Sequence, residues 1–297
     1  MIPVTVCIAA ICDTSMLLGM SDRMLTAGDI QFQPPSSKIW EITKSIVMMA
    51  AGDVGLQTEI WTQVRKSVDV RIQEKPNDWF RVEEVADLYR AAYFNLKRRR
   101  AEMEILAPLG LDSTSFLTQQ KSMDAELVSK IAQELISYRM PDVAAIIAGN
   151  NPLHGAPKGS AVVSGHLFVV ENGDVSCADK VGFACVGAGA WHANSAMMQT
   201  GHTPATSIPN ALLNIYTAKR RAEVAPGVGI ETDNFIITSA LGGYSDLKDD
   251  VMAAIGNAYT EYSKENELAR KKAENSLNEY IAEITKPKEP ATPQTTH

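Results

Sequence analysis

Short runs of apolar and β-branched residues open the chain, and clusters of turn residues separate them. Four runs share this pattern: Val4–Ala10, Met16–Met20, Lys38–Ile42 and Ser45–Ala51. Runs of this length with turn residues between them are typical of paired strands. The opening part of the chain therefore predicts two β-hairpins, and the segment Thr26–Asp29 between them reads as a breaker.

The apolar spacing changes to three or four residues after Gly52. One helical stripe is formed by four apolar residues: Leu56, Ile60, Val64 and Val68. Further helices are expected at four segments: Val82–Leu106, Ala125–Met140, Trp191–Thr200 and Ile208–Glu223. The stretch Leu109–Lys121 is polar and contains Gly110, so it is expected to be a loop.

Strands return in the second half of the chain. Four segments carry the strand pattern: Val143–Ala148, Leu167–Glu171, Gly182–Val186 and Asn234–Ser239. The dipeptide Asn172–Gly173 predicts a tight hairpin turn. The apolar stripe of Asp246–Ile284 predicts one long amphipathic helix or a helix pair, and residues 286–297, rich in Pro, Thr and Lys, predict a disordered tail.

Strands that cluster around groups of helices predict antiparallel sheets with helices packed outside them, rather than alternating βαβ units. The expected fold class is therefore α+β. The sequence shows no repeat of fixed period and no long linker, so residues 1–285 are expected to form a single domain.

Charge and composition exclude some classes of protein. Lys and Arg number 28 against 35 Asp and Glu, and a net charge of −7 opposes the neutralisation of phosphates that nucleic-acid binding requires. The apolar runs are too short to cross a bilayer, and no basic segment precedes the first of them, as it would in a secretory signal. Four cysteines in 297 residues do not suggest a disulfide framework. We therefore expect a cytoplasmic protein with neither nucleic acid nor membrane as a partner.

Several motifs of known chemistry are missing from the sequence. It has no Gly-x-Ser-x-Gly elbow, no Gly-Lys-Ser/Thr phosphate loop, no His-Glu-x-x-His and no Cys-x-x-Cys. The five histidines lack the spacing of metal ligands, so we expect neither a metal site nor an organic cofactor. The basic run Lys97–Arg100 precedes Glu102 and Glu104 and is read as a solvated helix face.

Four segments near the N-terminus carry the strongest functional signal: Thr5–Ala10, Ser21–Gly28, Ser37–Ile39 and Met49–Asp53. In order, they hold a threonine on the first strand, an aspartate ending the second, a Thr-Ala-Gly turn, a lysine on the third strand and a glycine before the first helix. This order resembles the start of proteasome β-type subunits, and in particular the bacterial homologues of the HslV and Anbu type. The resemblance implies the fold of the N-terminal nucleophile (Ntn) hydrolases, a four-layer αββα sandwich. Here it would carry an extra helical region at 76–140 and a C-terminal helical extension at 246–285.

The resemblance implies a threonine-type peptidase with Thr5 as its nucleophile. A threonine hydroxyl needs an adjacent base, and the α-amino group of an N-terminal Thr5 can take its proton. The positive charge of Lys38 would lower the pKa of both the amine and the hydroxyl, and Asp22 would keep Lys38 charged and oriented. The N–H of Gly52, at the start of a helix, would stabilise the oxyanion.

Substrate-binding residues follow from the same resemblance. Thr26 and Gly28 would line a cleft in which an extended peptide pairs as an added strand. Ala50 and Val54 would lie near the first specificity pocket and favour an apolar side chain. The expected substrate is therefore a peptide or an unfolded protein.

The sequence departs from the family pattern further along the chain. Ala188 stands in a Gly-x-Gly turn where the family has a serine, and Pro226 stands where it has a second serine. Glu223 takes the place of an aspartate and, as a longer carboxylate, is kept as a catalytic candidate. These departures remove two hydroxyl groups that polarise the nucleophile in the family.

The N-terminal segment sets a further condition. Met1–Val4 precede Thr5, and Ile2 is too large for ordinary removal of the initiator methionine. An active protein is therefore expected to cleave itself between Val4 and Thr5. Cys7 is a rival nucleophile by residue type, but the strand alternation points its side chain elsewhere, so it is read as a small buried residue.

Three functions are therefore weighed. The first is a proteasome-like threonine peptidase within a self-assembled ring of identical subunits. The second is a catalytically inactive ring or scaffold protein of the same fold, and the third is an Ntn amidase acting on small molecules. An unfoldase ATPase is a candidate partner of the first.

Overall fold

The computed structural model describes residues 5–27, 30–33, 37–76, 78–153, 163–238 and 243–285. The chain divides into two compact units, residues 1–248 and residues 249–297. The expectation that residues 1–285 form one domain is not tested by this division and stays a prediction.

The first unit contains two five-stranded antiparallel sheets. One sheet has the order β10–β1–β2–β11–β12, with β1 (Cys7–Cys12), β2 (Met16–Asp22), β10 (Phe183–Val186), β11 (Thr232–Thr238) and β12 (Gly243–Ser245). The other has the order β5–β6–β7–β8–β9, with β5 (Ile39–Thr43), β6 (Ile46–Gly52), β7 (Val143–Pro152), β8 (Val163–Glu171) and β9 (Asp174–Cys177). The α+β class and the two N-terminal hairpins are confirmed.

A short third ladder corrects one expectation. β3 (Leu25–Ala27) pairs with β4 (Ile30–Phe32), where the sequence suggested only a breaker. Gly28, one of the expected cleft residues, lies outside the described residues.

The two larger sheets pack face to face through an apolar core. Alternate residues of β1 and β6 point into it: Cys7, Ala9 and Ile11 from one sheet, and Val47, Met49 and Ala51 from the other. This period of two is the one expected for strands that bury one face against a second sheet. The inward-facing side chains of both sheets therefore pack against each other and hold the two sheets together.

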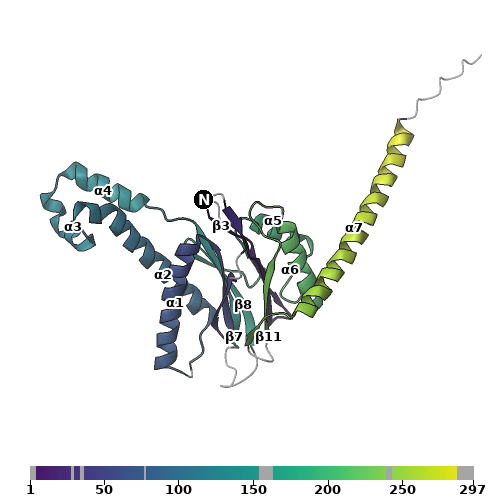
Figure 1. The fold of residues 1–297 in the computed structure, drawn as a ribbon, viewed down its shortest axis with the longest axis horizontal. Coiled ribbons are helices and arrows are strands. Elements are labelled where there is room, and N and C mark those ends of the chain that lie inside the picture. Colours follow the sequence, from purple (N-terminus) through teal and green to yellow (C-terminus); the bar gives the residue numbers. More distant parts are fainter. Residues whose placement is uncertain are drawn as a thin grey trace, which may run out of the picture. The chain divides into compact units, whose positions relative to one another are not determined.

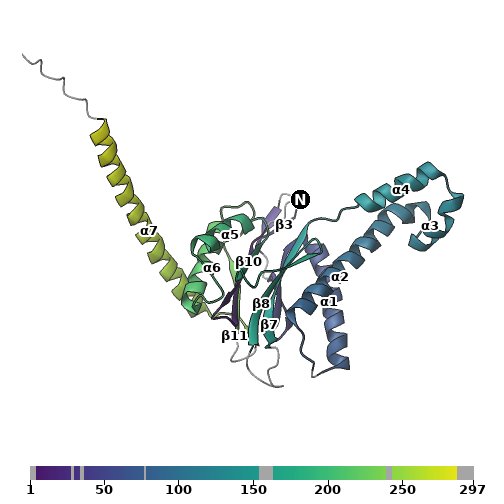
Figure 2. The same ribbon diagram turned by 180° about the vertical axis from the view of Figure 1, so that it is seen from behind.

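Helices cover the outer faces of both sheets. α1 (Val54–Glu74) and α2 (Val82–Ala101) contact β6, β7 and β8, whereas α5 (Ala190–Gln199) and α6 (Ile208–Ala222) contact β1, β2 and β10. Figures 1 and 2 show the two helix pairs on opposite sides of the paired sheets. The order of layers in this unit is thus helices, sheet, sheet, helices.

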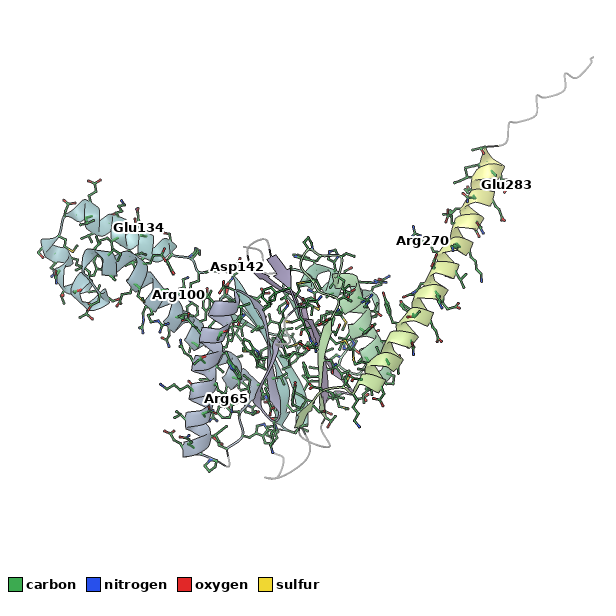
Figure 3. All side chains as sticks on the ribbon, viewed as in Figure 1. Arg65, Arg100, Glu134, Asp142, Arg270 and Glu283 are labelled. Atoms are coloured by element: carbon green, nitrogen blue, oxygen red, sulfur yellow. The ribbon has the colours of Figure 1, made fainter. Side chains whose placement is uncertain are left out.

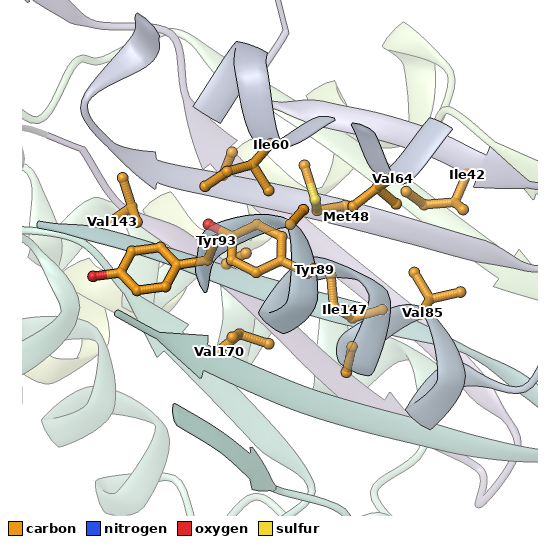
Figure 4. Packing of buried hydrophobic residues seen from close by; sticks show 14 of the residues in the cluster. Ile42, Met48, Ile60, Val64, Val85, Tyr89, Tyr93, Val143, Ile147 and Val170 are labelled. Carbon is orange, nitrogen blue, oxygen red and sulfur yellow. The ribbon is translucent and has the colours of Figure 1, made fainter. Parts of the chain in front are cut away.

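The stripe predicted for α1 is buried as expected. Its four members are fully covered: Leu56, Ile60, Val64 and Val68. They meet Tyr89 of α2 and Met48 and Ile147 of the sheet in one apolar cluster (Figure 4). Most of the stability of α1 therefore comes from this packed face rather than from helix propensity.

The junction between β6 and α1 depends on two residues. Gly52 has a φ of +112°, and a Cβ there would lie 2.4 Å from the carbonyl oxygen of Asp142, so only glycine fits without strain. Asp53 then caps α1, because its carboxylate accepts a hydrogen bond of 2.8 Å from the N–H of Leu56. The chain therefore turns sharply from sheet to helix at the position where the oxyanion donor is expected.

The region after α2 contains an element that the sequence analysis missed. α2 continues through the π-helical turn η1 (Glu102–Leu106) and the 3₁₀ turn η2 (Ala107–Leu109). Short helices follow: α3 (Ser113–Gln119), η3 (Gln120–Ser122) and α4 (Ala125–Ser137). The predicted loop Leu109–Lys121 is therefore wrong. Asp112 and Ser115 form a capping box that starts α3, and Phe116 packs on Leu106.

The basic run at the end of α2 has a structural role. Arg99 and Arg100 both bind the carboxylate of Glu59 on α1, at 2.7 Å and 2.5 Å. Figure 3 shows Arg100 on α2 and Arg65 on the neighbouring α1. The predicted solvated face therefore also ties the two helices together.

The second unit is described by one helix, α7 (Asp249–Ile284). Because α7 is continuous over 36 residues, this segment forms a single helix rather than a helix pair. The expected disordered tail, residues 286–297, lies outside the described residues. Across the described ranges, none of the helices combines the length and the apolar character needed to cross a membrane.

We predict that Gly19→Ala destabilises the first unit. A Cβ at Gly19 would lie 2.1 Å from Cε1 of Phe235, its fully buried partner across the β2–β11 ladder. Overpacking of this kind costs about 1–3 kcal/mol of unfolding free energy, which urea denaturation measures.

The double variant Gly19→Ala/Phe235→Leu is the control for that prediction. Because leucine leaves room for the new methyl group, the two changes should cost less together than the sum of the single changes. Strictly additive losses would contradict the predicted steric contact.

Candidate active site

Three side chains from three different elements meet at one end of the sheets. Thr5 lies two residues before the start of β1, Asp22 ends β2, and Lys38 directly precedes β5 of the opposite sheet. The exposed fractions are 2% for Thr5, 0% for Asp22 and 8% for Lys38. The antiparallel pairing of β1 with β2 brings Thr5 and Asp22 together, since the N–H of Asp22 donates to the carbonyl of Val6 at 3.2 Å. The structure therefore assembles three of the expected catalytic residues.

The three side chains form a closed hydrogen-bonded group. Thr5 Oγ1 donates to Asp22 Oδ1 at 2.5 Å and accepts a hydrogen bond from Lys38 Nζ. Lys38 Nζ also donates to Asp22 Oδ1 at 2.9 Å and to the carbonyl oxygen of Met24 at 2.6 Å. All three donors of the ammonium group are used. The Thr5 hydroxyl thus lies between a fixed positive charge and a fixed negative charge.

Backbone N–H groups hold the Asp22 carboxylate. Oδ1 accepts from the N–H of Val6 at 2.8 Å, and Oδ2 accepts from Met24 at 2.9 Å and from Gly229 at 3.0 Å. These donors come from three separate segments, so the carboxylate is fixed by the fold rather than by its own rotamer. A buried carboxylate needs such donors because it has left water.

The main chain of Thr5 is held by the turn after β10. The N–H of Gly189 donates to the carbonyl of Thr5 at 3.1 Å. Gly187 has a φ of +97°, and a Cβ there would lie 2.4 Å from the same carbonyl oxygen. Ala188 sits between these two glycines and offers a methyl group rather than a hydroxyl. The turn therefore positions Thr5 through its backbone alone.

Gly52 lies on the side of β6 that faces Lys38. The N–H of Ala50 donates to the carbonyl of Lys38 at 3.0 Å. Since N–H groups two residues apart on a strand point the same way, the N–H of Gly52 is directed to this side too, beyond the first residue of β5. The N–H of Gly52 therefore points toward the side of β6 on which Lys38 lies.

The expected substrate-binding residues are spread over three elements. Ala50 is mostly buried, and its side chain belongs to the helix-facing cluster. Val54 is the first residue of α1 and is half exposed. Thr26 is on β3. No specificity pocket is defined by these positions among the described residues, so their binding roles stay predictions.

Glu223 is not placed at the nucleophile. Its carboxylate accepts from Lys219 at 2.6 Å and from Arg220 at 2.9 Å. The side chain of Lys219 is fully buried, and burial lowers its pKa while Glu223 and, more weakly, Asp22 act to raise it. Glu223 is therefore engaged by Lys219 and Arg220, and Lys219 in turn interacts electrostatically with Asp22.

Two contributors were missed by the sequence analysis. Lys219 occupies a buried position on α6 among apolar neighbours, and its spacing of four from Glu223 was the available signal. Gly229 donates through its backbone N–H, for which the sequence carries no signal. The segment that contains Pro226 thus contacts Asp22 through the main chain instead of through a serine.

Cys7 is not a competing nucleophile. Its side chain is fully buried in the core between the sheets, and Sγ lies 3.5 Å from the carbonyl oxygen of Ala50. Burial raises the pKa of the Cys7 thiol to about 12, which Lys38 opposes and Asp22 reinforces. Within the described part of the chain, no group of three or more His, Cys, Asp or Glu side chains could hold a metal ion.

Comparison with known proteins adds no family assignment. No family model and no curated protein matches this chain. The functional argument therefore depends on the geometry of the site.

We predict that Cys7 resists alkylation in the folded protein. With a pKa of about 12, the thiol is ionised to roughly one part in 10⁴ at pH 8. Iodoacetamide should modify the exposed Cys177 first. Mass spectrometry of peptides identifies which cysteine has been modified. Rapid modification of Cys7 in folded protein, with Cys177 as the internal control, would contradict the assignment.

Proposed function

We propose that the protein is a threonine-type amide hydrolase of the Ntn class, with the four-layer fold of proteasome β-type subunits. The observation that carries the proposal is the buried contact of the Thr5 hydroxyl with Lys38 Nζ and with Asp22 Oδ1. Two packed antiparallel sheets with helices on both outer faces support the class. The expected substrate is an extended peptide or an unfolded protein.

The first half of the reaction uses a Thr5 that has become the first residue. Its free amine takes the proton of Oγ1 while Oγ1 attacks the carbonyl carbon of a peptide bond. Lys38 Nζ, which already binds Oγ1, stabilises the negative charge that develops there. The N–H of Gly52 receives the oxyanion of the tetrahedral intermediate.

The second half releases the products. Collapse of the intermediate breaks the C–N bond, and the leaving amine takes the proton from the Thr5 ammonium group. Water then attacks the resulting ester and gives one proton to the amine. The ester C–O bond breaks as the ammonium group passes that proton to Thr5 Oγ1, which restores the hydroxyl and the free amine. Asp22 keeps Lys38 in place throughout.

An inactive scaffold of the same fold is the second candidate. It is favoured by the methyl group of Ala188 in the turn beside Thr5 and by the engagement of Glu223 with Lys219 and Arg220. Neither group offers the Thr5 amine a hydrogen-bond acceptor. In this candidate the Thr5–Asp22–Lys38 group serves only to tie the two sheets together.

The proposal includes a ring of identical subunits that encloses the active sites, with an unfoldase ATPase as a candidate supplier of substrate. It also includes a cytoplasmic location, which the four free thiols favour because disulfides persist in oxidising compartments.

Substitution of Thr5 tests the peptidase. Thr5→Ala should lower hydrolysis of fluorogenic peptides by at least about 10³-fold, because it removes the atom that forms the acyl-enzyme. Thr5→Ser should retain measurable activity. Thr62→Ala, on an exposed position of α1, is the matched control and should leave the rate unchanged.

Covalent capture separates the two candidates. An active preparation should begin at Thr5 by N-terminal sequencing and should form an adduct on Thr5 with a peptide epoxyketone, detected by mass spectrometry. Protein that retains Met1 and forms no adduct would refute the peptidase and support the scaffold.

Assembly is tested by mass photometry. A ring predicts one dominant species whose mass is a multiple of the 32.3 kDa subunit and does not change with dilution. A stable monomer would refute the enclosed chamber, although the Thr5 chemistry would still be testable.

A further inference from the structure

A second group of catalytic side-chain types lies on the other sheet. Ser164 and His166 are on β8, and Asp179 follows β9. Ser164 Oγ lies 2.8 Å from His166 Nε2, and His166 Nδ1 lies 2.6 Å from Asp179 Oδ2. The order of contacts, hydroxyl to Nε2 and Nδ1 to carboxylate, is that of a serine hydrolase triad.

The local fold explains why the three residues meet. The turn at Asn172 and Gly173, both with positive φ, folds β9 back on β8. β9 ends at Cys177, so Asp179 lies beside His166, and its Oδ1 accepts from the N–H of Leu167 at 2.7 Å. Beyond the end of β9, the Asp179 carboxylate thus accepts the hydrogen bond from the Leu167 N–H of β8.

The same contacts set the proton positions. Burial acts to raise the pKa of Asp179, but the hydrogen bonds from His166 and from the Leu167 N–H hold it below its ordinary value. An ionised Asp179 accepts the proton of His166 Nδ1, so in the neutral imidazole Nε2 is the acceptor that faces Ser164 Oγ. This tautomer of the neutral imidazole is the one that a general base needs.

The side chains point away from the core between the sheets. Gly165, which separates Ser164 from His166, is the residue that faces this core, because a Cβ there would contact Ile11 at 3.2 Å. Ser164 is partly exposed, and the side chains of His166 and Asp179 are 23% and 27% exposed. A small molecule can therefore approach the hydroxyl.

This group is remote from Thr5. The N–H of Gly165 donates to the carbonyl of Thr14 at 3.4 Å, in the turn that follows β1, whereas Thr5 precedes β1. At about 3.4 Å per residue, the length of β1 separates the two sites by roughly 20 Å. The inference that follows does not rest on the proposed function of Thr5.

We propose that Ser164, His166 and Asp179 form a second nucleophilic site, which hydrolyses small, uncharged carboxylic esters. Asn151 pairs with Ser164 in the β7–β8 ladder and donates to the carboxylate of Glu83 at 2.8 Å, but Arg81 forms an ion pair with that carboxylate and offsets its charge. The negative charge at the site itself is the Asp179 carboxylate, which disfavours an anionic ester. The acyl group is small because Ser164 is only partly exposed.

The reaction is balanced by water alone. Ser164 Oγ bonds to the carbonyl carbon as its proton passes to His166 Nε2, and the C–O bond to the leaving alcohol breaks as that alcohol takes the proton. Water then attacks the acyl-serine and gives a proton to Nε2, which returns it to Ser164 Oγ as the bond from Oγ to the acyl carbon breaks. The products are one carboxylic acid and one alcohol.

A fluorophosphonate-biotin probe tests the site on the full-length protein. The folded wild type should be phosphonylated at Ser164, as located by mass spectrometry of peptides, and heat-denatured wild type should lose the labelling. His166→Gln and Asp179→Asn should slow labelling by about 10²-fold or more, and p-nitrophenyl acetate hydrolysis should fall in parallel.

Two controls keep the result specific. Ser176→Ala removes an exposed serine of the neighbouring β9 and should leave the labelling of Ser164 intact. Thr5→Ala should also leave the labelling of Ser164 intact, so the Ser164 site can be tested independently of the Thr5 site. The proposal would be overturned if folded wild type formed no adduct on Ser164, or if His166→Gln were labelled at the same rate as wild type. The three residues would then only hold the turn after β9 against β8.

Discussion

The ammonium group of Lys38 and the carboxylate of Asp22 are both removed from water, and they belong to opposite sheets. Neither charge is stable alone at this depth, because the loss of one partner from such a buried pair costs about 3–5 kcal/mol. The pair therefore requires the ends of β2 and β5 to stay together. The Thr5 hydroxyl, which contacts both groups, depends on the same approach of the sheets.

Much of the remaining structure serves to keep this approach fixed. The backbone N–H groups of Met24 and Gly229 donate to Asp22 Oδ2, and that of Val6 donates to Oδ1, which also binds Lys38. The glycine turn after β10 holds the carbonyl of Thr5, and Gly52 lets β6 end sharply at the helix. Because main-chain groups supply most of these contacts, the site tolerates side chains such as Ala188 without loss of its geometry.

The Thr5 group and the Ser164 group lie near opposite ends of β1, and different kinds of contact bring their side chains together. Thr5, Asp22 and Lys38 are brought together across the sheets and are nearly inaccessible. Ser164, His166 and Asp179 lie within one sheet, where a hairpin and the early end of β9 place them, and they remain partly exposed. The first group thus depends on packing between layers, and the second depends on register within one layer.

The sequence by itself determined the α+β class, the N-terminal hairpins and the stripe of α1, because hydrophobic period is a local property. The three members of the candidate site that the structure brings together came from the resemblance of the N-terminal segments to proteasome β-type subunits. It did not predict α3, which forms in a polar segment because a capping box stabilises its first turn. It also did not predict the short β3–β4 ladder. Only the tertiary structure decided that Gly229 donates to Asp22 and that Asp179 reaches His166. Both contacts join residues that no local pattern connects, and a backbone donor such as the Gly229 N–H leaves no trace in residue type.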